Sequence, residues 1–382
     1  MRSATRDLLG NLFWLGVEAV KGEVAVGNWV STQQLERPTR ILAVGKAALA
    51  MFNGLPDDWR RGASVLIVTK TGHLGETVFG HNVVALETAH PVPDRSSLEA
   101  GRRALDFVES CGPNDRLLML VSGGASSLLE HLREGVSHDT LVSVTTAALA
   151  EGADIAELNR RRNELSAVKG GRLLSQFGGA KVDVAAISDV RGDDIGVIGS
   201  GIAACAEACG FDYNCEIVAS NAIARQAILA AARAKGPKIV ADGETLYGDV
   251  EDVAAAIASE VDQGANGLYV YGGEPTVVLP ENPGLGGRNQ TLALLLAAHF
   301  QGRDDVIGLV AGTDGTDGPT EATGAFFDGE TYQSPAARDA LTSANSAEYL
   351  AGVGDQFVTG PTGTNVMDLA LILKSPGGSR AG

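Results

Sequence analysis

The first candidate for chemistry is a lysine that follows a hydrophobic run. In the segment LAVGKAALAM (residues 42–51), Lys46 comes after an apolar run and Gly45, at the start of a stretch with helical composition. If the run is a buried strand, Lys46 lies in the crevice at the carboxyl end of the sheet, where open α/β folds bind ligands. An ammonium group beside helix N–H groups favours an anion. The alternative is an exposed lysine on the first turn of a helix.

A Gly/Ser turn is the second candidate. The apolar run Leu117–Val121 leads into Ser122, Gly123 and Gly124, and Ser126 follows closely. Two glycines allow the backbone to turn its N–H groups toward one point, and the serine hydroxyls add donors, which together indicate a phosphate-binding nest. The sequence contains no GxxxxGK[ST] motif, so the turn is not a Walker A loop. The alternative is a tight turn that binds no ligand.

Three carboxylates follow a further apolar run, Val182–Ile187. They belong to Asp189, Asp193 and Asp194. Clustered carboxylates repel one another unless a cation lies among them, and oxygen ligands suit Mg²⁺, the ion that accompanies nucleotide phosphates. A solvated acidic loop is the alternative. Residues 199–204 (GSGIAA) match GxGxxA, but a loop-like sequence precedes them, so they are weak evidence for a dinucleotide-binding turn.

Four glycine-rich segments mark the second half of the chain. They cover residues 272–276, 284–290, 311–319 and 359–365. In the second of these, Arg288 stands beside flexible glycines at the start of a predicted helix. Its guanidinium group and the helix N-terminus are therefore expected to hold one carboxylate or phosphate together. Each loop taken alone is explained by chain turning, but four of them with donors or carboxylates favour a binding site.

The elements that position these segments follow an α/β pattern. Residues 7–20 have the spacing of an amphipathic helix, and runs rich in β-branched residues and leucine predict buried strands of a mostly parallel sheet. The predicted strands of the first half are Ile41–Val44, Ser64–Thr69, Asn82–Leu86, Leu117–Val121, Val182–Ile187 and Ile217–Ala219.

A strong helix, Asn221–Lys235, stops at Gly236-Pro237, where we expect the domain boundary. The sequence therefore predicts domains 1–236 and 237–382. In the second, smaller α/β domain the pattern predicts helices in Asp249–Gln263 and Asn289–Phe300, and strands at Leu268–Tyr271, Thr276–Leu279 and Val306–Val310.

Charge and cysteine content exclude several classes of protein. The formal charge of −17 disfavours general binding to nucleic acid or to an anionic membrane, so an anionic ligand needs a local basic site. The four cysteines form no CxxC pair and no zinc-site pattern, which is typical of reduced thiols. Charged and polar residues interrupt the apolar N-terminal segment, which is too short to span a membrane. We expect a cytoplasmic protein.

Ten segments, in order, resemble the glycerate 2-kinase family. They are AVGKAALAM, TKTGHLG, AHPVPDRSSLEAGRRAL, VSGGASSLLE, LNRRRNELSAVKGGRL, SDVRGDD, GGEPTVVLP, GLGGRNQTLAL, AGTDGTDGPTEATGAF and VTGPTGTNVMDLALIL. The resemblance implies a larger Rossmann-like three-layer α/β/α domain and a smaller C-terminal MOFRL domain. It also implies transfer of the γ-phosphoryl group of ATP to the 2-hydroxyl of D-glycerate, with Mg²⁺. The lysine of the family's GKA segment falls on Lys46 and the arginine of its GGRNQ segment on Arg288.

Phosphoryl transfer mainly requires alignment and charge neutralisation, and the candidate residues are assigned accordingly. We expect Lys46, Arg288 and Asp189 to be catalytic, and Arg162 and Lys169 to join Lys46 and Arg288 at the substrate. Asp189 either accepts the hydroxyl proton or holds Mg²⁺ with Asp193. The expected nucleotide or phosphate contacts are Ser122, Gly123, Gly124, Ser126, Asn221, Gly312, Thr313, Asp314, Gly315, Thr364 and Asn365. The expected site lies in the cleft between the domains, and a homodimer is allowed for.

Two other classes of function remain open at this point. An NAD(P)H-dependent hydroxypyruvate reductase needs a glycine fingerprint between a strand and a helix, and the one partial match follows a loop. A non-catalytic anion-binding module needs ligand binding without turnover. Candidate residues in both predicted domains favour the kinase over this module.

Overall fold

The chain folds into two compact units, which are described separately. The computed structural model describes residues 2–151, 155–205 and 209–377. Lys21–Ala219 form one unit, here called the parallel-sheet unit. Met1–Val20 and Ser220–Gly382 form the other, here called the mixed-sheet unit. Along the described chain, no helix combines the length and the apolar character needed to cross a membrane.

The parallel-sheet unit contains six parallel strands in the order β3-β2-β1-β4-β5-β6. This is the strand order of a doubly wound nucleotide-binding sheet, so the predicted Rossmann-like domain is confirmed. The strands are β1 (Arg40–Val44), β2 (Ser64–Lys70), β3 (Val83–Thr88), β4 (Arg116–Val121), β5 (Lys181–Ile187) and β6 (Asp212–Ala219). Each of the six agrees with a predicted strand, although β6 begins five residues earlier than expected.

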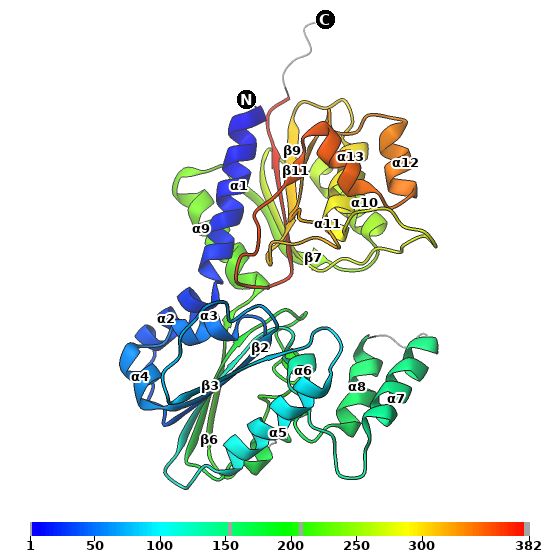
Figure 1. The fold of residues 1–382 in the computed structure, drawn as a ribbon. Helices are drawn as coiled ribbons and strands as arrows, with labels where there is room; N and C mark the ends of the chain where they lie inside the picture. Colours follow the sequence, from blue (N-terminus) through cyan, green and yellow to red (C-terminus); the bar gives the residue numbers. More distant parts are fainter. Residues whose placement is uncertain (1, 152–154, 206–208, 378–382) are drawn as a thin grey trace, which may run out of the picture. The chain divides into compact units, whose positions relative to one another are not determined.

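Helices cover both faces of this sheet (Figure 1). The helices of this unit are α2 (Gly22–Thr32), α3 (Ala48–Asn53), α4 (Asp57–Gly62), α5 (Arg95–Glu109), α6 (Ala125–Leu128), α7 (His138–Ala150) and α8 (Ile155–Leu165), with short 3-10 turns at Leu174–Gln176 and Ile198–Ser200. Of these, α7 and α8 pack on each other. Ala100, Ala104 and Val108 of α5 pack on the core side chains of β1, β2 and β4. The second 3-10 turn overlaps the first two residues of the GSGIAA match, and β5 ends well before it at Ile187, so this segment is not the strand-to-helix turn of a dinucleotide site.

The mixed-sheet unit has the strand order β11-β10-β9-β12-β8-β7, in which only β7 and β8 pair in parallel. The strands are β7 (Ile239–Leu246), β8 (Gly267–Gly273), β9 (Val306–Gly312), β10 (Gly324–Asp328), β11 (Gln356–Phe357) and β12 (Asp368–Lys374). The predicted strand Thr276–Leu279 is wrong. Thr276 makes one isolated bridge with Asp249, and Val278 is 81% exposed.

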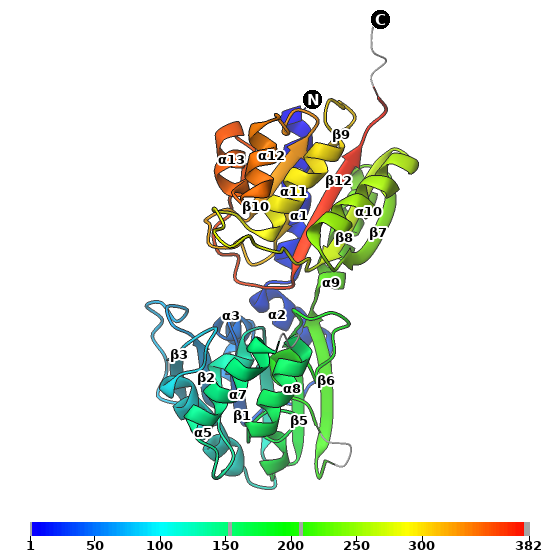
Figure 2. The ribbon, with the colours of Figure 1, turned by 90° about the vertical axis from the view of Figure 1, so that its right-hand side faces the viewer.

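Two helical layers sandwich the mixed sheet (Figures 1 and 2). One layer contains α1 (Arg2–Ala19) and α9 (Asn221–Lys235), and the other contains α10 (Val250–Gln263), α11 (Arg288–His299), α12 (Ala336–Thr342) and α13 (Ser346–Val353). Because α1 and α9 pack on each other and on this sheet, the compact units divide the chain after residues 20 and 219. This differs from the predicted division at residue 236, since an apolar helix face does not reveal which sheet it covers.

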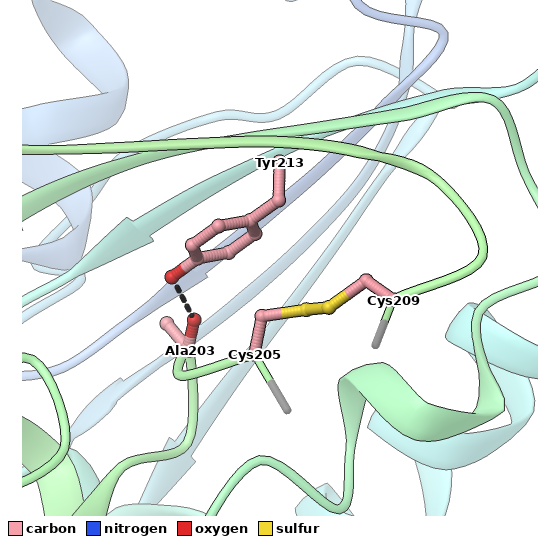
Figure 3. Close-up of a disulfide and its surroundings, with 4 residues drawn as sticks. All are labelled: Ala203, Cys205, Cys209 and Tyr213. Atoms are coloured by element: carbon pink, nitrogen blue, oxygen red, sulfur yellow. Dashed lines mark hydrogen bonds between the residues drawn. A yellow bond between two sulfur atoms is a disulfide. The ribbon is translucent and has the colours of Figure 1, made fainter. Parts of the chain in front are cut away.

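A disulfide links Cys205 and Cys209 in the loop before β6, close to the Tyr213 hydroxyl, which donates to the Ala203 carbonyl at 2.8 Å (Figure 3). The Cα atoms of the two cysteines are 6.5 Å apart, within the usual range for a disulfide. Reduced thiols were expected at these two positions, so the structure differs from the sequence interpretation there. Cys111 and Cys215 are free.

Candidate active site

Strand register brings three of the predicted segments to one edge of the parallel sheet. Val44, at the end of β1, is paired with Val121, at the end of β4, and Val121 is paired with Ala186 of β5. The residues that follow these strands therefore leave the sheet side by side. This is the edge where doubly wound sheets bind ligands, and we call it the carboxyl edge.

Backbone and hydroxyl groups connect the first two segments at this edge. The Lys46 N–H donates to the Gly123 carbonyl at 3.0 Å, and the Ala47 N–H donates to the Ser122 hydroxyl at 3.1 Å. The half-buried Lys46 thus lies beside the Gly/Ser turn, as the sequence predicted. The predicted helix after this turn is only the four-residue α6, so the turn and its side chains supply the site and the helix does not.

Gly124 shapes the turn between β4 and α6. Its φ of +85° lies in the left-handed region that favours glycine. A Cβ atom added here would lie 3.2 Å from Lys46 Cγ and also 3.2 Å from His90 Nε2. The Lys46 stem and the His90 imidazole therefore both lie against this glycine. The sequence analysis assigned no role to His90, although its position just after β3 placed it at the same edge.

Asp189 lies against the neighbouring glycine of the turn. A Cβ atom added to Gly123 would lie 2.8 Å from Asp189 Cγ and closer still to Oδ2, so the carboxylate is packed directly on the Gly123 backbone. Asp193 lies farther along the same loop, where it is half-buried with a φ of +55°. Along the described chain, no three His, Cys, Asp or Glu side chains are grouped to hold a metal ion. Mg²⁺ commonly uses one or two carboxylates together with substrate phosphates, so the chemistry of the Asp189 and Asp193 side chains suits this ion.

Ser126 connects the Gly/Ser turn to the loop after β5. Its hydroxyl is 2.7 Å from the Ser200 hydroxyl. The Ser200 carbonyl in turn accepts from the Gly170 N–H at 2.9 Å. This chain of contacts brings the KGG segment, which contains Lys169, next to the turn.

Lys169 itself is fully buried, which the sequence did not predict. Its ammonium group donates to Glu130 Oε2 at 2.6 Å, and the Ser166 hydroxyl donates to Glu130 Oε1 at 2.5 Å. Burial lowers the pKa of Lys169, and the Glu130 carboxylate opposes this effect. A lysine with no exposed surface and a carboxylate partner holds the loop in place, so we no longer assign it a substrate contact.

Arg162 lies close to the same carboxylate. Burial lowers the pKa of its guanidinium group, and Glu130 opposes the shift. Among the described residues, its buried Nη2 atom has no hydrogen-bond partner. Of Lys169 and Arg162, only Arg162 therefore remains a candidate for contact with an anionic substrate.

In the mixed-sheet unit, register brings the glycine-rich loops to one end of the sheet. Asp368, the first residue of β12, pairs with Gly273 of β8 on one side and with Gly312 of β9 on the other. The loops that contain Glu274 and Asp314 therefore start beside Asp368. β12 was not among the predicted strands, although the segment containing it was part of the resemblance.

Arg288 is held by two carboxylates at this end of the sheet. Its Nε donates to Asp368 Oδ2 at 2.6 Å, and its Nη1 lies 2.7 Å from Glu274 Oε1. Burial works to lower the pKa of Arg288, but the two carboxylates outweigh it and raise the pKa. The Arg288 side chain is 35% exposed, so part of the guanidinium group reaches solvent.

The N-terminus of α11 does not bind an external anion together with Arg288, which corrects the sequence interpretation. The N–H groups of Asn289 and Gln290 donate to the two carboxylate oxygens of Asp317 at 3.0 and 2.8 Å. Asp317 is 3% exposed, and burial raises its pKa to about 6. The helix start is thus already occupied by a carboxylate of the protein itself.

Three predicted nucleotide contacts are buried and use their polar groups within the fold. The Asn221 amide donates to the Asp368 and Val366 carbonyls at 2.9 and 3.0 Å. The Thr364 hydroxyl donates to the Val20 carbonyl at 2.7 Å, and the Thr313 hydroxyl donates to the Met367 carbonyl at 2.6 Å. These side chains hold the start of β12, so we no longer assign them to a ligand.

The other predicted nucleotide residues lie in the loops next to them. The Asp314 carboxylate accepts from the Thr316 N–H at 3.0 Å, and the Asn365 side chain accepts from the Met367 N–H at 3.2 Å. Asp314 and Asn365 are half-buried, while Gly312 and Gly315 flank the loop. Asp314 and Asn365 remain candidates for ligand contact, whereas the buried Gly312 and Gly315 donate their N–H groups to the Thr323 and Gly312 carbonyls at 2.9 and 3.2 Å.

A separate cavity of about 1000 Å³ opens beside α1 in the mixed-sheet unit. It is lined by Arg2, Ser3, Arg6, Asp7, Gly10, Asn11, Trp14, Phe326, Gly354, Gln356 and Phe357. None of the predicted site residues lines it.

A doubly wound sheet with a lysine, a glycine turn and a carboxylate at its carboxyl edge is typical of α/β enzymes that bind phosphorylated ligands. Comparison with known proteins agrees with this class. A domain of unknown function, DUF4147, matches residues 8–233, and the MOFRL family matches residues 267–368. The chain belongs to the glycerate 2-kinase family, whose members are phosphotransferases with an alcohol group as acceptor.

Individual relatives cover nearly the whole chain. A D-glycerate 2-kinase of Thermotoga maritima is 34% identical over 402 residues, covering 93% of this chain and 95% of the relative. A putative hydroxypyruvate reductase of Agrobacterium vitis is 33% identical over 381 residues, with 87% and 98% covered. The crystal structure of a glycerate kinase from Thermotoga maritima superimposes with a TM-score of 0.88 at 31% identity, covering 97% of this chain and 100% of that chain.

Proposed function

We propose that the protein is an ATP-dependent glycerate 2-kinase. It transfers the γ-phosphoryl group of ATP to the 2-hydroxyl of D-glycerate, and releases 2-phospho-D-glycerate and ADP. The observation that carries the proposal is the convergence of Lys46, the Gly123-Gly124 turn and Asp189 at the carboxyl edge of the parallel sheet. The similarity to glycerate kinases along most of the chain supports it.

The proposed reaction forms a bond between the 2-hydroxyl oxygen and the γ-phosphorus, and breaks the bond from that phosphorus to the oxygen of the ADP leaving group. Lys46 neutralises charge on the transferring group or on the glycerate carboxylate, which is the main requirement of phosphoryl transfer. The N–H groups of the Gly/Ser turn and the Ser122 and Ser126 hydroxyls orient phosphate oxygens. Arg288 keeps its proposed role toward the anionic substrate through the part of its guanidinium group that reaches solvent, while Asp368 and Glu274 balance its charge.

Asp189 has one of two roles in this proposal. It accepts the proton of the 2-hydroxyl, or it holds Mg²⁺ together with Asp193 and the nucleotide phosphates. When bound, Mg²⁺ would supply charge neutralisation on those phosphates. In either role the Asp189 carboxylate needs a fixed position, and its packing against Gly123 supports one.

The alternative activity is hydroxypyruvate reduction with NADH or NADPH, and two relatives from Agrobacterium vitis are named putative hydroxypyruvate reductase. The GSGIAA match that favoured this activity begins in a 3-10 turn, separated from the end of β5 by eleven residues, and does not directly follow a strand, which weakens this alternative. One pair of assays separates the two activities. The protein is incubated with D-glycerate and MgATP while ADP is followed, and with hydroxypyruvate and NADH or NADPH while absorbance is followed. ADP formation that depends on glycerate supports the kinase. Oxidation of NADH or NADPH that depends on hydroxypyruvate, with no ADP formed from glycerate, contradicts it.

A further inference from the structure

The imidazole of His90 occupies a position at the carboxyl edge to which no role has been assigned. We propose that His90 donates a hydrogen bond to an oxyanion of the substrate or nucleotide, and that Lys46 and Lys70 supply the positive charge of the same subsite. The inference deepens the proposed kinase function and rests on it. The oxyanion is either the carboxylate of glycerate or a phosphate of the nucleotide, two ligands with the same recognition chemistry.

Geometry places the ring at the phosphate-binding turn. His90 follows β3 by two residues, and its Cδ2 and Nε2 atoms lie 3.1 and 3.2 Å from the position that a Cβ atom of Gly124 would take. Lys46 Cγ lies 3.2 Å from the same point. The imidazole and the lysine stem therefore flank one turn, and the imidazole is half-buried there.

Several groups with positive or titratable charge face His90. Lys46, Lys70 and His73 act on it electrostatically, from the loop after β1, the end of β2 and the loop after β2. Burial first, and then these charges, lower the pKa of His90 to about 4. The ring is therefore neutral at physiological pH, and carries one N–H donor and one acceptor nitrogen.

The two lysines have no partner that would explain their position. Among the described residues, neither Lys46 nor Lys70 forms an ion pair with a carboxylate. In a chain with a formal charge of −17, a lysine whose stem lies against the glycine turn and a second lysine that acts on the same histidine favour an anionic ligand. The His73 ring nitrogen Nδ1 lies 3.1 Å from the Lys46 carbonyl, so this second histidine orients the backbone of Lys46.

Two variants distinguish a hydrogen-bonding role of His90 from a packing role. If His90 donates a hydrogen bond, His90→Gln should be the more active variant, and if it only fills space, His90→Phe should be. His90→Phe fills the space but has no N–H group, whereas His90→Gln keeps an amide donor and fills less space. We expect the Michaelis constant for the ligand that His90 contacts to rise about 10-fold or more in His90→Phe and less in His90→Gln, as loss of one hydrogen bond to a charged group requires. His81→Gln is the matched control, because His81 is exposed and precedes β3 at the opposite end of the strand.

Binding measurements keep the test independent of turnover. Proton NMR of the imidazole of the wild-type protein is followed on addition of D-glycerate alone, and of ADP with Mg²⁺ alone. The His90 resonance, identified by its loss in His90→Gln, should shift with one of the two ligands, and that ligand is then the source of the oxyanion. No shift with either ligand, or a smaller loss in His90→Phe than in His90→Gln, would overturn the proposal. Failure of the kinase proposal gives a different result from failure of the His90 proposal: the wild-type protein then forms no ADP from glycerate and MgATP.

Discussion

Because Asp189 packs directly on Gly123, a methyl group added at Gly123 tests whether the position of this carboxylate matters for activity. In Gly123→Ala, the new Cβ would lie 2.8 Å from Asp189 Cγ, whereas ordinary contacts begin at 3.4 Å. The carboxylate is the far end of a side chain and must move by about 1 Å. A displacement of this size at a reacting group costs on the order of 100-fold in rate. Gly123 does not have a positive φ, so alanine adds no left-handed strain to the backbone.

We therefore expect Gly123→Ala to reduce kcat/KM for glycerate phosphorylation about 100-fold while the thermal unfolding midpoint stays close to that of the wild type. The assay couples ADP release to an absorbance change at saturating MgATP. Gly112→Ala is a matched control, because its Cβ would lie 4.0 Å from the carboxylate of Asp115, a comfortable distance. Wild-type kcat/KM in Gly123→Ala would refute the reasoning that Asp189 acts from this position.

Three further predictions follow from the same contacts. Lys46→Ala and Arg288→Ala should each lower kcat/KM about 100-fold or more, as loss of a transition-state charge contact does, and Arg288→Ala should also lower the thermal unfolding midpoint because the buried Asp368 carboxylate loses its partner. Near-wild-type activity in both variants would contradict their assignment. Lys169→Met leaves the buried Glu130 carboxylate unpaired and should lower the free energy of unfolding by about 3–5 kcal/mol. Urea denaturation should show the double variant Glu130→Gln/Lys169→Met closer to the wild type. Because the folded-state pKa of Asp317 is raised to about 6, the native protein binds more protons than the unfolded chain between pH 4 and 6. The contribution of Asp317 to the free energy of unfolding thus falls by roughly 3 kcal/mol as pH rises through that range. Asp317→Asn should remove this slope from thermal midpoints measured against pH, and parallel curves for the two proteins would contradict it.

The four central strands of the parallel sheet, β1, β2, β4 and β5, were predictable because they are buried on both faces. Runs such as Leu117–Val121 are apolar throughout and end at glycine or polar residues, so local sequence suffices to find them. The mixed sheet was harder to predict, since most residues of β7 are half-buried with no regular alternation and β11 is only two residues long. The positions of α1 and α9 depend on packing between distant parts of the chain.

The part of the candidate site that lies directly after predicted strands was predictable from the sequence. Lys46, the Gly/Ser turn and Asp189 each follow an apolar run, and parallel register alone brings them together. The partners of Arg288 and of the α11 N-terminus were not predictable, because they are distant in sequence. Asp317, which accepts from the Asn289 N–H, is 28 residues away, and Asp368, which accepts from the Asn289 side-chain amide, is 79 residues away. His90 was missed because a single histidine after a strand has no sequence pattern of its own.

The identity of the phosphorylated product tests the central claim most directly. After incubation with D-glycerate and MgATP, the ³¹P NMR signal of the product is recorded without proton decoupling. A phosphate on the 2-oxygen is coupled to one CH proton, and a phosphate on the 3-oxygen is coupled to two CH₂ protons. The account predicts a doublet from 2-phosphoglycerate that appears together with ADP and is lost in Lys46→Ala. A triplet, or no new phosphate ester, would contradict it.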